Sequence, residues 1–320
     1  MGADRDGRRQ VTSLDIFLQQ LLNGLVLGSL YALVALGYTM VYGILELINF
    51  AHGEVVMFGA MVSLAVLGAL AGAPLPPAAM LAIAAAVAVP VCMAMGFAIE
   101  RVAYRPLRRA PRLAPLITAI GVSIVLQNVA MIVWGRQYVS FPPLVDLQIY
   151  ELGGATITNV QILIVALAGL MMAGLLALVR RTRLGRAMRA TAQNREVAEL
   201  MGVDVNRVIS ATFVIGSALA AIAGMLVAAY YGLAHYGMGF MLGLKAFTAA
   251  VLGGIGNIPG AMLGGLLLGI IESLGAGYIG DLTGGFLGSH YQDIFAFLVL
   301  ILVLVFRPSG LLGERVADRA

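Results

Sequence analysis

The sequence predicts an all-α polytopic membrane protein, and three observations lead to that fold class. Of the 320 residues, 61% are hydrophobic and only 11% are charged, whereas a soluble domain of this length exposes far more charge. The apolar residues fall into runs of about 20, which is the length a helix needs to cross the hydrocarbon core. The chain also contains 40 glycines, and small residues allow transmembrane helices to approach closely. One transmembrane domain is therefore expected over residues 1–320.

Apolar runs predict about eight or nine transmembrane helices. Seven runs each predict one span, at about 17–42, 54–72, 77–99, 115–134, 159–179, 208–231 and 291–306. The Gly-rich stretch from about 243 to 280 is long enough for two more. It is interrupted at Gly256–Gly260, where glycine and proline are too dense for regular helix, so a hinge or re-entrant element is expected there.

Paired glycines four residues apart predict close helix–helix contacts. They occur at Gly24 and Gly28, Gly260 and Gly264, and Gly265 and Gly269. In a chain so rich in glycine, chance explains any single pair about equally well.

The arginines predict the orientation in the membrane rather than a nucleic-acid surface, because they cluster between apolar spans. The two basic loops, Glu100–Arg112 and Arg180–Arg195, are expected in the cytoplasm, and the loop Gly135–Thr158 is expected outside. Counting back gives nine crossings and an external N-terminus. A re-entrant segment around 46–54 would instead give eight spans and an internal N-terminus, so the side of the polar tail 1–15 stays open.

Four polar residues, Glu46, Asn49, His52 and Glu54, interrupt the apolar stretch Gly37–Ala60. An unpaired ionised carboxylate in hydrocarbon costs several kcal/mol, so these groups must face water, protein or one another. In one arrangement a helix ends near residue 43 and a second begins near 49–53, with Glu54 in its first turn, where the helix dipole favours an acid. In the other, one continuous helix places Asn49 and His52 on a shared face.

The cytoplasmic loop 180–206 contains a predicted short helix with an exposed apolar side. Asn194 is a favourable N-cap and Gly202 is placed to end the helix. Its apolar residues lie beyond the membrane, where they favour contact with a partner. A helix resting on the bilayer surface is the alternative. The candidate docking residues are Asn194, Arg195, Glu196, Ala198, Glu199, Leu200, Met201 and Gly202.

Three long segments and the tail carry a resemblance to a known family. They are Leu21–Ala60, Arg189–Leu226, Gly243–Ser273 and the tail FRPSGLLG at Phe306–Gly313. Together they resemble the LivH-type permeases of branched-chain amino-acid ABC importers. The loop 180–206 looks like their coupling segment, although REVAELMG matches the better-known EAA form of that segment only in part.

The resemblance implies an ABC-importer permease fold in the bacterial inner membrane. It implies translocation of branched-chain or similar neutral amino acids that a periplasmic binding protein delivers. It also implies a second, related permease and two cytoplasmic ATPases that bind ATP and Mg²⁺. In agreement, GxxxxGK[ST] is absent and the only lysine is Lys245, so no enzymatic activity is expected here. No HExxH or CxxC spacing indicates a metal site.

Two alternatives to the amino-acid importer are a related permease for urea, short amides or another small polar solute, and an ion-coupled transporter that uses Glu54 and Glu272.

Under the importer hypothesis, polar residues within the spans are candidates for the solute path. They are Tyr42, Asn49, His52, Glu54, Lys245 and Asn257. Asn49 and His52 would offer donors to a zwitterionic amino acid and Glu54 an acceptor. A structural role, in holding the broken helices or the permease–permease seam, is nevertheless favoured over lining the path, and a place at the cytoplasmic or periplasmic surface is the remaining alternative. Lys245 either pairs with Glu272 or with an acid of the Glu46/Glu54 group, or extends to the external interface. The second interpretation is favoured slightly, since Lys245 is only a few residues into its expected span.

Overall fold

The computed structural model describes residues 13–108, 110–111, 113–142, 147–284, 286, 291–307 and 309–313. Within them, seven helices are long and apolar enough to cross a membrane. They are α1 (Ser13–Leu45), α2 (His52–Ala69), α3 (Pro77–Ala98), α4 (Leu113–Trp134), α5 (Asn159–Arg181), α8 (Val205–Tyr231) and α10 (Ile258–Leu282). Two shorter apolar helices are α9 (Met238–Gly253) and α11 (Gln292–Phe306). Each of the expected spans corresponds to one of these helices. Of the polar tail expected over 1–15, only the last three residues are described, and they open α1.

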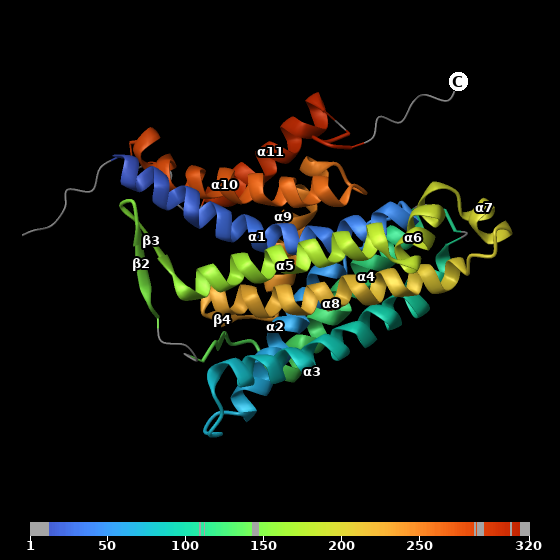
Figure 1. Ribbon diagram of the computed structural model, residues 1–320, viewed down its shortest axis with the longest axis horizontal. Helices are drawn as coiled ribbons and strands as arrows, with labels where there is room; N and C mark the ends of the chain where they lie inside the picture. The colour runs from blue at the N-terminus through green and yellow to red at the C-terminus, as the bar shows by residue number, and fades with distance from the viewer. Residues whose placement is uncertain are drawn as a thin grey trace, which may run out of the picture.

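Helix α1 forms the centre of the bundle, because 94% of its most apolar stretch is buried, against 72% for α2 and α8. It packs against α8, α9 and α10. Helices α3, α4 and α5 bury only about a fifth of their apolar stretches, as expected where one side of a helix faces lipid. Figure 1 shows this elongated bundle from the side.

The paired glycines bring three helices into backbone contact, as their spacing predicts. A Cβ on Gly265 would lie 2.4 Å from the Cα of Ala32, and one on Gly269 would lie 2.3 Å from the Cα of Gly28. A Cβ on Gly264 would lie 2.6 Å from the backbone nitrogen of Gly253. The first two contacts join α10 to α1 and the third joins α10 to α9. Any side chain at these positions would push the helices apart.

The chain is broken between α1 and α2, as in the first of the two arrangements expected for the polar stretch. Helix α1 ends at Leu45, and Glu46 has a φ of 55°, a left-handed conformation that ends the helix. Helix α2 starts at His52. The last turn of α1 is capped by a residue 151 positions later in the sequence, because the Arg195 guanidinium donates two hydrogen bonds, of 2.6 and 3.2 Å, to the Ile44 carbonyl.

A second break separates α9 from α10 at residues 254–257, as the glycine and proline density predicts. Gly254 and Gly256 have φ values of 103° and 94°, which only glycine adopts readily. The C-terminal tail covers the exposed end of α9, since the backbone nitrogens of Leu311 and Leu312 donate to the last two carbonyls of that helix at 2.9 and 3.0 Å. The break is therefore an ordered segment that the C-terminal tail holds in place through these hydrogen bonds.

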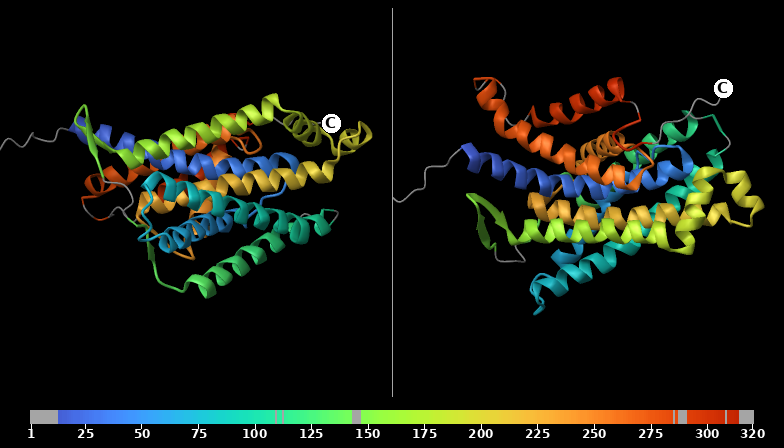
Figure 2. Two further views of the ribbon diagram at one scale, coloured as in Figure 1. Left: turned by 60° about the horizontal axis from the view of Figure 1, so that its bottom comes forward. Right: turned by 45° about the horizontal axis from the view of Figure 1, so that its top comes forward.

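The two ends of the bundle differ in structure. At one end, β2 (Ile149–Leu152) and β3 (Ala155–Thr158) form a hairpin, and β1 (Val139–Ser140) pairs with β4 (Leu233–Ala234). At the opposite end lie α6 (Arg183–Gln193) and α7 (Arg195–Leu200) (Figure 1). The two further views in Figure 2 show the same separation.

The first turns of α1 lie at the hairpin end. The side-chain carbonyl of Gln19 accepts a 2.7 Å hydrogen bond from the Thr156 backbone, and its amide donates to the Thr156 carbonyl at 3.1 Å. If the basic α6–α7 end lies in the cytoplasm, as its arginines predict, α1 starts on the outer side, in agreement with the expectation of an external N-terminus.

Candidate functional site

Glu54 is the most deeply buried acid of the broken segment, with no exposed surface. Its Oε1 accepts hydrogen bonds from the Ser123 hydroxyl at 3.0 Å and the Gln127 amide at 2.8 Å, both on α4. Its Oε2 has no hydrogen-bond partner among the described residues. A buried carboxylate oxygen without a partner is costly and is a typical sign of a functional site.

The free oxygen of Glu54 faces the first turn of α9. A Cβ on Gly239 would lie 2.6 Å from Glu54 Oε2, and a Cβ on Gly53 would lie 2.3 Å from the Gly239 carbonyl oxygen. Glycine at both positions therefore lets α9 cross directly over the start of α2. Displacement of this one turn would uncover the carboxylate.

Asn49 and His52 join the break to neighbouring helices. The Tyr104 hydroxyl donates to the Asn49 side-chain oxygen at 3.2 Å. The His52 ring packs edge-on against Tyr38, with ring centroids 5.0 Å apart, and it lies against Gly37 of α1, where a Cβ would overlap it. Both side chains are almost completely buried. The structure thus brings Asn49, His52 and Glu54 together around the start of α2.

Lys245 is not at the external interface, so the favoured interpretation of this residue was wrong. Its ammonium lies 2.7 Å from Glu272 Oε1 on α10 and 2.6 Å from Asp293 Oδ1 on α11. The Tyr31 hydroxyl of α1 donates to both Glu272 oxygens, at 3.0 and 3.1 Å. Lys245 is 7% exposed. The alternative of a buried pair with Glu272 is correct, and Asp293 is an additional partner.

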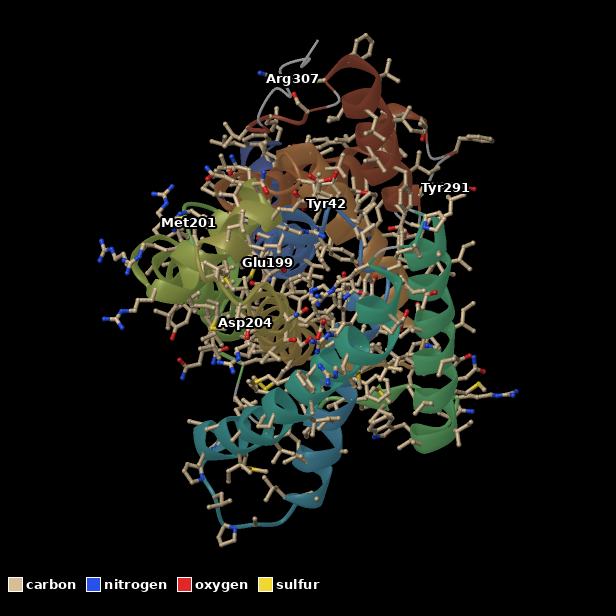
Figure 3. All side chains as sticks on the ribbon, turned by 90° about the vertical axis from the view of Figure 1, so that its right-hand side faces the viewer. Tyr42, Glu199, Met201, Asp204, Tyr291 and Arg307 are labelled. Carbon is tan, nitrogen blue, oxygen red and sulfur yellow. The ribbon has the colours of Figure 1, made fainter. Side chains whose placement is uncertain are left out.

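Tyr42 and Asn257 both lie at the break between α9 and α10. The Tyr42 ring is in reach of Gly256, where a Cβ would lie 3.9 Å from the ring. The Asn257 amide donates to the Leu312 carbonyl at 2.8 Å, and its oxygen accepts from the Gly260 backbone at 2.9 Å. Both polar groups of Asn257 therefore fasten the tail and cap α10. Figure 3 looks onto the α7 end and labels Tyr42 in its middle.

The three groups of polar residues follow one face of α1. Tyr31, Tyr38 and Tyr42 are spaced i, i+7 and i+11, so they share a face of the helix. Tyr31 contacts the Lys245–Glu272 pair, Tyr38 contacts His52, and Tyr42 lies beside the α9–α10 break. At 1.5 Å per residue the three positions span roughly 16 Å of helix. A row of polar groups therefore runs lengthwise inside the bundle.

A pocket of about 310 Å³ opens beside the Tyr31 end of this row. Its walls come from α1, α8 and α9 and from the segments next to β1 and β4, which places it toward the hairpin end. Apolar and aromatic side chains dominate, and Tyr138 stacks on His235 with ring centroids 4.6 Å apart. Lys245 and Tyr31 supply polar groups.

The short helix α7 has the predicted caps and an exposed apolar side. The Asn194 side chain accepts from the Val197 backbone at 3.1 Å, and Gly202 has a φ of 84°. Leu200 and Met201 are 85% and 80% exposed, and Figure 3 shows Met201 at the outer margin of this end. Ala198 faces inward and is buried. An apolar surface this exposed beyond the membrane indicates an interaction site.

Sequence reasoning missed the side chains that hold the candidate residues in place. Ser123 and Gln127 are four residues apart in an otherwise apolar span, a spacing that puts them on one face, so this signal was available. Asp293 lies at the start of the last apolar run, and an acid next to an apolar span also indicates a polar contact inside the bundle. Tyr31 gave none, because a tyrosine in an apolar helix is ordinary. No group of three or more His, Cys, Asp or Glu side chains in the described residues could hold a metal ion.

Comparison with known proteins assigns the family. Residues 20–304 match the family described as "Branched-chain amino acid transport system / permease component". The chain is 50% identical over 303 residues to the high-affinity branched-chain amino acid transport system permease protein BraD of Pseudomonas aeruginosa. It is 48% identical to the LivH permease proteins of the corresponding system in Escherichia coli K12 and Salmonella typhimurium. Each alignment covers 93% of this chain and 96% of the relative. The chain therefore belongs to the family of permease components of branched-chain amino acid transport systems.

Proposed function

We propose that this chain is the transmembrane subunit of an ATP-driven importer in the bacterial inner membrane. It translocates branched-chain or similar neutral amino acids that a periplasmic binding protein delivers. The observation that carries the proposal is the identity of about half of all residues to permeases named for these substrates, over nearly the whole chain. The largely apolar pocket near Tyr31 and Lys245 supports it, because its walls suit an aliphatic side chain and its polar groups suit a zwitterion.

The importer contains a second, related permease and two cytoplasmic ATPases, which bind ATP and Mg²⁺. The support is that this chain lacks a phosphate-binding GxxxxGK[ST] loop and presents the exposed side of α7 at its basic end. ATP hydrolysis then takes place on the partner chains, and this chain has no enzymatic activity of its own.

Helix α7 is placed to pass a movement of the ATPase to the solute path. It packs on α6 and α8, and Arg195 in its first turn holds the end of α1 through the Ile44 carbonyl. The break at 46–51 follows directly and leads to Glu54. A rigid-body displacement of α7 would therefore pull on the segment that positions the buried carboxylate.

The docking role of α7 is tested by charge reversal. Glu196 and Glu199 are both exposed, so Glu196→Lys with Glu199→Lys changes the surface of α7 and leaves its buried Ala198 in place. We expect the ATPases to be lost from the purified complex while membrane insertion is unchanged. Glu151→Lys, on the exposed hairpin at the other end, is the matched control. ATPases copurifying normally with the double variant would exclude docking through this helix.

The path is tested at Glu54 and Asn49. We expect Glu54→Gln to lower uptake by roughly ten- to hundredfold, the equivalent of one lost charge-assisted hydrogen bond. The amide can keep the contacts to Ser123 and Gln127 but loses the charge. Asn49→Leu should likewise lower uptake more than it lowers assembly. Radiolabelled leucine uptake is the measurement, and the amount of ATPase that copurifies reports on assembly. Normal uptake by both variants would assign these residues a purely structural role.

A further inference from the structure

A groove of about 520 Å³ lies on the outside of the bundle near its basic end, between α3 with the π-helical turn that extends it (Ile99–Tyr104) and the start of α8. The groove has two distinct parts. Three arginines, Arg101, Arg105 and Arg207, line one part, and Phe97 and Val214 line the other. Val214 and Arg207 lie two turns apart on α8, so the apolar part is toward the membrane and the arginines are toward the cytoplasm.

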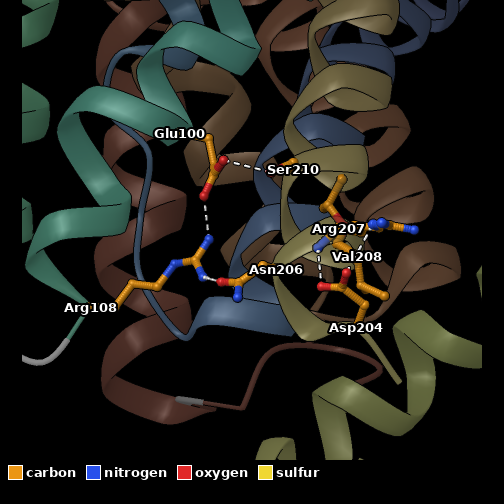
Figure 4. Close-up of polar contacts among 8 residues, drawn as sticks. Glu100, Arg108, Asp204, Asn206, Arg207, Val208 and Ser210 are labelled. Carbon is orange, nitrogen blue, oxygen red and sulfur yellow. Dashed lines mark hydrogen bonds and ion pairs between the residues drawn. The ribbon is translucent and has the colours of Figure 1, made fainter. Parts of the chain in front are cut away.

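The acids near the groove are already neutralised. Glu100 is fully buried, forms an ion pair with Arg108, and accepts a 2.6 Å hydrogen bond from the Ser210 hydroxyl. Arg108 is fixed in turn by the Asn206 side chain at 2.7 Å. Figure 4 shows this chain of contacts on the wall of the groove.

The positive charge of the groove has no complete counterpart in the protein. Asp204 Oδ2 lies 2.9 Å from Arg207 Nε, so that pair is balanced. Arg101 and Arg105 form no ion pair with any residue that the structure describes. Two arginines in one groove repel each other, and an anion bound between them would remove that repulsion.

The apolar part of the groove continues onto the lipid-facing side of α3. Phe97 is 47% exposed and lies one turn from Arg101 on the membrane side. Together with Val214 it suits a hydrocarbon chain, whereas the arginines lie at the depth of the lipid headgroups on the cytoplasmic side. A ligand that fits both parts has a phosphate at one end and an acyl chain at the other.

We propose that this groove binds one anionic phospholipid of the cytoplasmic leaflet, with its phosphate between Arg101 and Arg105 and an acyl chain along Phe97 and Val214. The bound lipid joins the end of α3 to the start of α8, the helix that directly follows α7. The proposal depends on the orientation of the bundle and is independent of the solute transported.

The proposal is tested by the lipid that stays with the purified chain. We expect Arg101→Gln with Arg105→Gln to lower the amount of retained phosphatidylglycerol by about tenfold or more, measured by mass spectrometry after mild detergent extraction. The matched control is Arg183→Gln with Arg186→Gln, which removes the same charge from exposed positions on α6 and should leave the amount of retained phosphatidylglycerol unchanged. Equal retention by both double variants would overturn the site. Size-exclusion chromatography establishes that both variants are folded.

Two further measurements separate the lipid from other anions. The detergent-solubilised wild-type chain should take up added phosphatidylglycerol in preference to phosphatidylcholine, and inorganic phosphate at millimolar concentration should not displace the lipid. Displacement by phosphate would identify a site for a free anion and overturn the lipid assignment. A double variant that keeps its lipid but loses the copurifying ATPases would instead show that the arginines contact protein.

Discussion

At the scale of single residues, the ammonium of Lys245 is shared by two acids from two different helices. Glu272 is fully buried and Asp293 is 37% exposed, so the inner acid depends on the lysine while the outer one also reaches solvent. One lysine thereby fastens α9 to α10 and to α11. Removing one partner of a buried pair leaves an uncompensated charge, which is worse than removing both.

This asymmetry gives a stability prediction. Lys245→Met should lower the free energy of unfolding by about 3–5 kcal/mol, because the Glu272 carboxylate is left buried without its cation. Lys245→Met combined with Glu272→Gln should recover most of the loss. Unfolding in detergent, followed by tryptophan fluorescence, measures both. A single variant as stable as the wild type would mean that Glu272 is already neutral or that water reaches it.

Residue-level reasoning from sequence predicted the burial of Glu54 correctly and the burial of Lys245 incorrectly, for a physical reason. Acids and amides inside an apolar run avoid lipid by facing water, protein or one another, so a polar cluster of Asn49, His52 and Glu54 inside the bundle was predictable. The depth of Lys245 depended on where its helix begins. The expected span started near 243, but α9 begins at Met238, which moves the lysine away from the helix end.

At the scale of elements, the crossing of α1 and α10 depends on glycines that no larger residue can replace. Gly28 and Gly269 face each other across this crossing, with the backbone of each helix within contact distance of the other. Such contact gains dispersion energy along the whole crossing, which is the main attraction between helices in lipid.

The crossing can be tested with one bulky residue. Gly269→Leu should abolish the folded, monodisperse protein, because the new side chain would overlap the backbone of Gly28. Gly169→Leu on α5 is the control, since a Cβ at that position meets nothing within 4 Å. Size-exclusion chromatography after detergent extraction measures the yield. A folded Gly269→Leu variant would show that α1 and α10 can separate without loss of the fold.

Helix positions were readable from the sequence, and helix neighbours were not. The apolar runs, and the glycine and proline residues that interrupt them, located every span to within a few residues. The capping residues located α7. Nothing local indicated that Gln127 on α4 would reach Glu54 on α2, or that Arg195 would cap α1. These contacts join residues 73 and 151 positions apart, so they depend on the assembled bundle.

At the scale of the whole molecule, the hairpin and α7 mark the two faces of the membrane. The hydrogen bonds between Gln19 and Thr156 place the beginning of α1 with the hairpin, and the basic loops predict that α7 lies in the cytoplasm. The two ends therefore meet different partners in the importer proposed above.

This orientation predicts a labelling pattern. A membrane-impermeant maleimide added outside spheroplasts should label Leu14→Cys and leave Met201→Cys unlabelled. Both positions are well exposed, and the natural Cys92 is completely buried, so the unaltered chain serves as a blank. After the cells are opened, Met201→Cys should react as well. The opposite pattern would place the hairpin in the cytoplasm and reverse every assignment of sides.

The contact between the C-terminal tail and the end of α9 has a consequence for how the protein matures. The carbonyls of Leu252 and Gly253 receive their hydrogen bonds from Leu311 and Leu312, which the ribosome adds about 60 residues later. Until then the last carbonyls of α9 lack these hydrogen-bond donors. A nascent chain that has not yet added residues 311 and 312 thus displays an open hinge to proteases and chaperones.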